Sequence, residues 1–89
     1  MEQNFNLYHI FYTVAKCKNI SGAARELFIS QPAISKAIAR LEQNLGSTLF
    51  LRSSRGVKLT EAGELLYGQV ERAFSAIPQG EQQLMRMQT

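Results

Sequence analysis

Apolar residues recur at helical spacing in the first part of the chain and predict a helix over residues 5–18. The inward side of this helix is formed by Leu7, Ile10, Phe11, Val14 and Ala15. Asn4 or Asn6 is suited to cap its start, and Asn19 is suited to a left-handed stop. Phe5, Tyr8 and Tyr12 extend its apolar surface beyond what one small core needs. We therefore expect these aromatic residues to meet another helix or a second subunit.

A shorter helix and a longer one follow, joined by the tight apolar connection Phe28–Ile29. The shorter helix begins at Ser21 and turns small residues inward, which lets the next helix cross it closely. The longer helix has Ser30 as its N-cap and Pro32 in its first turn, and it stops at Gly46. Its core side is formed by Ile34, Ile38, Leu41 and Leu45. This arrangement predicts a helix-turn-helix unit, although many all-helical domains contain such corners.

The pattern changes to short strands after Gly46. Residues 49–52 and 57–59 predict two strands, and residues 53–56 predict the turn between them. An isolated two-stranded ribbon is only marginally stable. We therefore expect this ribbon to lean on the helices through Leu49, Leu51 or Leu59.

Thr60 caps a last, long helix along which a heptad seam repeats. The seam consists of Gly63, Leu66, Val70, Ala73, Ile77, Gly80, Leu84 and Met87. Pro78 removes a backbone hydrogen bond, so we expect a kink or local break near residues 76–77, with the helix resuming beyond it. The helix either packs back on its own domain or pairs with a second copy. We favour a dimer because the seam is long, and we place Leu66, Val70, Ala73, Ile77 and Leu84 at its interface.

These elements predict a mainly α protein with two parts. Residues 1–59 form a winged helix-turn-helix, with three helices and a two-stranded β wing. Residues 60–89 form a linker and dimerisation helix. One small domain of this kind buries only a modest core, which favours oligomerisation as a source of stability.

Charge is distributed unevenly along this framework. The net charge is +3, but residues 16–60 hold eight Lys or Arg and two Glu, whereas residues 61–89 hold two Arg and four Glu. The wing tip carries Arg52, Arg55 and Lys58 and no acid. A polar, positive set also forms the outer side of the third helix: Gln31, Pro32, Ser35, Lys36, Ala39, Arg40 and Gln43. Such a surface is typical of phosphate binding, although an ordinary solvated helix face and a solvated basic hairpin are the plain alternatives.

Other functional classes find little support in the residues. The single cysteine, Cys17, cannot form an internal disulfide, and with the single histidine, His9, it cannot build a zinc site. We expect His9 to be a surface or helix-packing residue, Cys17 to be half-buried, and the protein to need no cofactor or metal. No run approaches membrane-spanning length, and no secretion signal is present, so we expect a cytoplasmic protein. The main alternative is a winged helix that docks proteins, which would not need a positive wing and a positive recognition helix together.

Several segments resemble one family closely. They are ISGAAREL at 20–27, SQPAIS at 30–35, Leu41-Glu42, Leu45-Gly46, Leu49-Phe50, Arg52 and LTEAG at 59–63. In order and spacing, they are similar to the N-terminal DNA-binding domain of LysR-type transcriptional regulators. The resemblance implies a bacterial, nucleoid-associated regulator and no enzyme. Members also carry a C-terminal ligand-sensing domain, which we expect to be absent here, so that an inducer would act only through that domain.

The resemblance also implies roles for individual residues. The helix at 31–45 would enter the major groove and the wing the minor groove, in a dimer bound to an interrupted A·T-rich inverted repeat. Base contacts would come from Gln31, Pro32, Ala33, Ser35 and Lys36. Phosphate contacts would come from Ser21, Ser30, Arg40, Arg52, Ser53 and Ser54, and Arg55 would enter the minor groove. Lys36 stands where many members have arginine, which weakens bidentate recognition, and the full-length protein would be a dimer or a tetramer.

Overall fold

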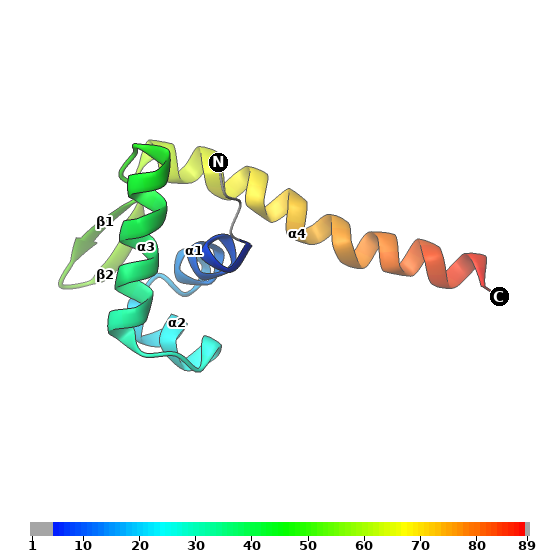
Figure 1. Cartoon of the computed structure of the whole chain (residues 1–89), viewed down its shortest axis with the longest axis horizontal. Helices are drawn as coiled ribbons and strands as arrows, with labels where there is room; N and C mark the ends of the chain where they lie inside the picture. Colours follow the sequence, from blue (N-terminus) through cyan, green and yellow to red (C-terminus); the bar gives the residue numbers. More distant parts are fainter. Residues whose placement is uncertain (1–4, 89) are drawn as a thin grey trace.

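The computed structural model describes residues 5–88 and contains four helices and one hairpin. The elements are α1 (Phe5–Cys17), α2 (Ile20–Leu27), α3 (Gln31–Leu45), β1 (Phe50–Ser53), β2 (Gly56–Leu59) and α4 (Glu61–Met87). The first three helices and the hairpin gather at one end, and α4 extends away from them (Figure 1), so the molecule measures 51 × 28 × 22 Å. The structure confirms a mainly α, winged helix-turn-helix architecture followed by a long helix.

Polar caps set the limits of α3 and α4 as predicted. The Ser30 hydroxyl accepts a hydrogen bond from the Ala33 amide at 3.2 Å, and the Thr60 hydroxyl accepts one from the Gly63 amide at 2.9 Å. Gly46 ends α3 with a left-handed φ of 68°. Each cap satisfies backbone groups that a helix end leaves unpaired.

The start of α2 differs from the prediction. Asn19, rather than Ser21, is the N-cap, because its side chain accepts a hydrogen bond from the Gly22 amide. The left-handed residue in this turn is Lys18, with φ of 62°. The Lys18 carbonyl accepts a hydrogen bond from the Val57 amide of the wing at 3.0 Å, which ties the turn to the hairpin.

The start of α1 excludes one of the two candidate caps, Asn6, by one residue. Asn6 lies inside the helix, which begins at Phe5, so it does not cap it. The other candidate, Asn4, lies outside the described residues. The inward stripe of α1 is unaffected by this shift.

The core combines the inward sides of the helices with the base of the wing. Its buried residues are Leu7, Ile10, Phe11, Val14, Ala23, Ala24, Ile34, Ile38, Leu41, Leu49, Phe50 and Val70. The Phe11 and Phe50 rings lie 5.4 Å apart and join α1 to β1. The ribbon therefore leans on the helices through Leu49, with Leu59 packed at the edge of the core and Leu51 exposed.

The first half of α4 packs on its own domain, which corrects one predicted interface residue. Val70 is a buried core residue, and Leu66 is half-buried beside it. Tyr12 of α1 stacks on Tyr67 at 5.4 Å and meets Phe74 edge-on at 5.2 Å. The aromatic contacts between α1 and α4 confirm that Tyr12 meets another helix, and they explain why Val70 faces inward rather than toward a partner.

The predicted helix break does not occur, because α4 runs continuously from Glu61 to Met87 with Pro78 inside it (Figure 1). Proline deprives the Phe74 carbonyl of its usual intrahelical donor. Residues 75–80 are exposed, so water is free to bond the backbone there. Continuity across Pro78 carries the helix well beyond the winged unit.

Candidate nucleic-acid interface

The outer side of α3 is a polar, basic surface because its other side is the core. Ile34, Ile38 and Leu41 are buried. Opposite them, the exposed residues of the helix are Gln31, Pro32, Ala33, Lys36, Ala39, Arg40, Gln43 and Asn44. Ser35 is half-buried at the edge of this surface, facing the wing.

Glu42 is turned away from this surface, which sequence reasoning missed. Its carboxylate accepts hydrogen bonds from the Leu49 amide at 2.7 Å and the Phe50 amide at 3.3 Å. These two bonds anchor the start of β1 to the end of α3. Because Glu42 is the only acidic residue of α3 and bonds to the backbone at the start of β1, the basic face of the helix carries no carboxylate.

The wing is held in place at its other strand by a close backbone approach. Gly56 has φ of 121°, and a Cβ atom there would overlap the Lys18 carbonyl oxygen. The adjacent Val57 amide donates to that same oxygen. Only glycine fits this conformation and spacing readily, so Gly56 brings the wing against the α1–α2 turn.

These anchors bring the predicted contact residues from three elements into one groove. The groove, of about 550 Å³, lies between the start of α2, the start of α3 and the wing. Its polar lining includes Ser21, Gln31, Ser35, Arg52, Ser53, Ser54 and Arg55. The Arg52 guanidinium donates to the Ser35 hydroxyl at 3.3 Å, which links the wing directly to α3.

The remaining predicted contact residues lie beside this groove. Pro32, Ala33, Lys36 and Arg40 are exposed along α3. Ser30 is exposed at the start of α3, where its hydroxyl already accepts the capping bond from Ala33 and keeps its own hydrogen free to donate. All of the predicted contact residues therefore occupy the neighbouring surfaces of α2, α3 and the wing.

The charges on this surface are available to an anionic partner. Within residues 5–88, Lys36, Arg40, Arg52 and Arg55 form no salt bridges. Cys17, half-buried behind α2, adds no negative charge: burial raises the pKa of its thiol, and Glu26, whose Oε1 lies 3.9 Å from the sulfur, raises it further. The potential over the groove is thus set by cations.

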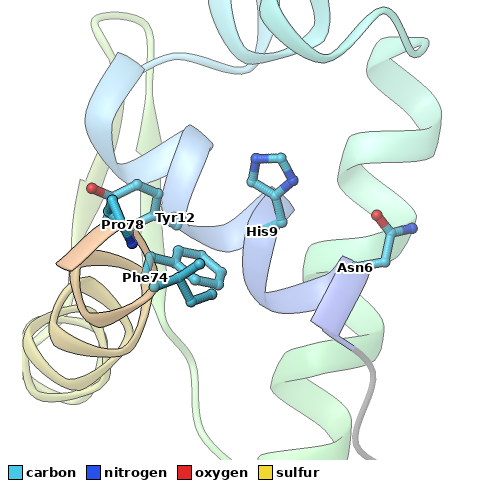
Figure 2. Close-up of a pocket in the computed structure, with 6 residues that line it drawn as sticks. Asn6, His9, Tyr12, Phe74 and Pro78 are labelled. Carbon is cyan, nitrogen blue, oxygen red and sulfur yellow. The ribbon is translucent and has the colours of Figure 1, made fainter. Parts of the chain in front are cut away.

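A second, apolar groove lies between α1 and α4, away from the basic surface. Figure 2 shows its labelled lining residues, Asn6, His9 and Tyr12 from α1 and Phe74 and Pro78 from α4. The His9 ring meets Phe74 edge-on at 6.0 Å, which confirms its helix-packing role. In the part of the chain that the structure describes, no three metal-ligating side chains cluster and no helix has the length and apolar character needed to cross a membrane.

Solved structures with this architecture include DNA complexes. The CbnR DNA-binding domain in complex with DNA is 30% identical, with a TM-score of 0.81, and the match covers 98% of this chain and 100% of that one. The BenM DNA-binding domain bound to catB site 1 DNA is also 30% identical, with a TM-score of 0.85 and 98% of each chain covered. At 30% identity, these two domains share both the fold and part of the amino-acid sequence with this chain.

Curated relatives are transcriptional regulators. BbuR of Bordetella bronchiseptica is 51% identical over 63 residues, covering 71% of this chain and 19% of BbuR. BudR of Raoultella terrigena is 51% identical over 57 residues, covering 64% of this chain and 20% of BudR. The chain thus spans about a fifth of the length of these two regulators.

The family described as "Bacterial regulatory helix-turn-helix protein, lysR family" matches residues 5–64, which include α1, α2, α3 and the wing. The match covers most of the chain and all of the groove described above. The chain therefore belongs to the lysR family of bacterial transcription regulators, as a helix-turn-helix DNA-binding domain and not an enzyme.

Proposed function

We propose that the chain recognises specific sequences of double-stranded DNA, with α3 in the major groove and the wing in the minor groove. The observation that carries this proposal is the single polar groove in which Gln31 and Ser35 of α3 meet Arg52 and Arg55 of the wing. A duplex laid along this groove would meet side chains of both elements at once. The DNA complexes formed by CbnR and BenM, which share this fold, support the same use here.

Base reading is assigned to the first turns of α3. The Gln31 amide suits adenine N6 and N7, and the apolar surfaces of Pro32 and Ala33 suit a thymine methyl. Ser35 bonds several base edges and discriminates little. Lys36 contributes a single hydrogen bond to a base or a phosphate, because an ammonium lacks the planar fork of arginine.

We assign phosphate contacts to polar and basic residues around the first turns of α3, namely Ser21, Ser30, Arg40, Arg52, Ser53 and Ser54. These contacts position the domain without reading sequence. Arg55, at the exposed tip of the hairpin, would enter the minor groove, where narrow A·T-rich DNA attracts a guanidinium. This is why we propose an A·T-rich site.

Pairing of two copies through α4 would give an interrupted inverted repeat. Beyond Phe74 the helix projects from the domain with Ile77 61% exposed and Leu84 55% exposed. A second α4 would cover this apolar stripe, with Ala73, Ile77 and Leu84 in contact and Leu66 at the edge. Two-fold symmetry in the protein is then matched by two-fold symmetry in the DNA.

The remaining proposals concern the whole regulator. We place it in the bacterial cytoplasm, on the nucleoid, as a dimer or a tetramer. Its inducer would be a small molecule bound by a C-terminal domain of the kind that LysR-type regulators carry. The DNA-binding domain itself needs no cofactor.

A domain that docks proteins through α3 is the competing proposal. Such a domain gains nothing from a basic wing facing a basic helix, whereas phosphate binding uses both. Its binding would also depend little on salt, whereas neutralising phosphates makes DNA affinity fall steeply with salt.

The test of base reading compares Gln31→Ala with Gln43→Ala, since both residues are exposed on α3. Affinity is measured by fluorescence anisotropy on the preferred duplex and on a scrambled duplex. Gln31→Ala should lose about 1–3 kcal/mol on the preferred duplex alone, and Gln43→Ala should change little. An equal loss on both duplexes for Gln31→Ala would contradict its base-reading role.

A further inference from the structure

Phe28 is the left-handed C-cap of α2, where its backbone N–H donates to the Ala24 carbonyl, but the fold does not explain why a large, exposed aromatic side chain stands there. It was expected to form a tight apolar connection with Ile29, but its side chain is 94% exposed. It also has a left-handed φ of 58°, which a bulky side chain rarely adopts. Asparagine or glycine would make the same turn at lower cost. Phe28 thus gains almost no burial in the free protein in return for an unfavourable backbone conformation.

The surroundings of Phe28 connect it to the DNA-binding surface. Phe28 lines a groove between the outer side of α2 and the start of α3, together with Ser21, Arg25, Ile29, Ser30 and Gln31. Ser21 and Gln31 also line the groove between α3 and the wing. The two grooves are therefore continuous through these residues, and Phe28 lies at the end farther from the wing.

Arg25 gives this second groove the charge that a phosphate requires. Its side chain is exposed on α2, and it forms no salt bridge within the described part of the chain. An exposed guanidinium beside an exposed aromatic ring matches the alternation of phosphate and deoxyribose along a DNA strand. A protein partner would need no continuity with Gln31, whereas DNA lying on α3 must pass near this end of the surface.

We propose that Arg25 and Phe28 form a further contact with the DNA backbone, in which Arg25 pairs with a phosphate and Phe28 packs against the neighbouring deoxyribose. The contact lies outside the major-groove and wing contacts, and it lengthens the footprint of the domain beyond the start of α3. It rests on the proposed DNA binding, since it has no role in a domain that binds no DNA.

The proposal predicts that substitutions of the two residues change the salt dependence of DNA affinity differently. Phe28→Asn keeps a residue that tolerates the left-handed turn, so the fold is preserved. It should weaken binding to the preferred duplex about fivefold, as expected for losing roughly 40 Å² of apolar contact, with the salt slope unchanged. Arg25→Ala should weaken binding and also reduce the slope of log K against log salt by about one for each bound protomer, that is, by about two on the inverted repeat.

The experiment measures affinity by fluorescence anisotropy at several salt concentrations, with thermal unfolding recorded for every variant. Leu65→Asn and Arg72→Ala serve as matched controls, because Leu65 is 75% exposed and both residues lie on α4, away from the two grooves. The expected result is a loss for Phe28→Asn and Arg25→Ala with wild-type affinity for both controls.

Two outcomes would overturn the inference. Wild-type affinity for Phe28→Asn and Arg25→Ala overturns it while leaving the proposed function intact. In that case, lower transcription activation by Phe28→Asn at full DNA occupancy would assign the turn to a protein partner instead. Failure of the wild-type chain to bind any duplex overturns the proposed function and this inference together.

Discussion

At the scale of single residues, Gly56 and Gly68 should respond in opposite ways to replacement by alanine. Gly56 has a positive φ, and a Cβ there would overlap the Lys18 carbonyl oxygen, whereas Gly68 lies in α4 with no such neighbour within 4 Å. Gly56→Ala should therefore destabilise the fold by about 2 kcal/mol or more. Gly68→Ala should stabilise it by about 0.5–1 kcal/mol, because alanine is the better helix former. Urea unfolding of both variants checks the pair, and a stable Gly56→Ala would show that the wing is not held by this close approach.

Glu42 is the residue whose role the sequence concealed. On a helical projection it falls near the edge of the basic face, and nothing local indicates that the chain returns to place two amides against it. Its bonds to the Leu49 and Phe50 amides depend on the path of the chain after Gly46. A tertiary contact of this kind has no signature in the spacing of residues along α3.

Removing this carboxylate should loosen the wing. Glu42→Ala leaves both amides short of a partner and should cost about 1–3 kcal/mol in urea unfolding, whereas Gln43→Ala beside it should cost almost nothing. Amide hydrogen exchange at Leu49 and Phe50 should quicken in Glu42→Ala. Unchanged exchange at these two amides would mean that Glu42 does not anchor the wing.

At the scale of elements, the sequence predicted the first residue of a helix correctly only where a single good capping residue preceded the helical pattern. Ser30 and Thr60 were predicted correctly, since each is followed directly by its helical pattern. Asn19 and Ser21 are both good caps two residues apart, and only the structure shows that Asn19 makes the capping bond, by accepting from the Gly22 amide. The strands were predicted to within one residue, because Gly56 and the flanking apolar residues mark the hairpin.

The packing of α4 on α1 is the second feature at this scale, and it depends on Tyr12, Tyr67 and Phe74. A heptad seam indicates which residues share one side of a helix, but it does not say what covers them. Val70 is covered by its own domain, whereas Ile77 is exposed. The spacing of the residues could not predict which part of the seam its own domain buries and which part is left exposed.

Phe74→Ala should free α4 beyond Tyr67 while keeping the winged unit intact. The loss of its edge-on contacts should cost about 1–2 kcal/mol, and hydrogen exchange should quicken in residues 70–80. Affinity for a single half-site should stay at the wild-type value, and affinity for the inverted repeat should fall. Ser75→Ala, at an exposed neighbour, is the control, and equal losses on both duplexes would show that the contact supports the winged unit itself.

At the scale of the whole molecule, the projecting half of α4 sets the expected assembly. Leu84→Glu should weaken self-association measured by sedimentation equilibrium, since it places a charge in the apolar stripe. Gln83→Glu adds the same charge to the same helix outside the seam and should leave association unchanged. Equal behaviour of the two variants would remove α4 from the dimer interface.

The central claim is tested most directly by selecting bound sequences from a random pool of duplex DNA and recording the salt dependence of binding. Two protomers that each place roughly four cations on phosphates should give a slope of log K against log salt of about −7. The account predicts enrichment of an interrupted, A·T-rich inverted repeat with this slope. Enrichment of a single half-site would contradict pairing through α4, and no enrichment with a flat salt response would contradict DNA recognition by this surface.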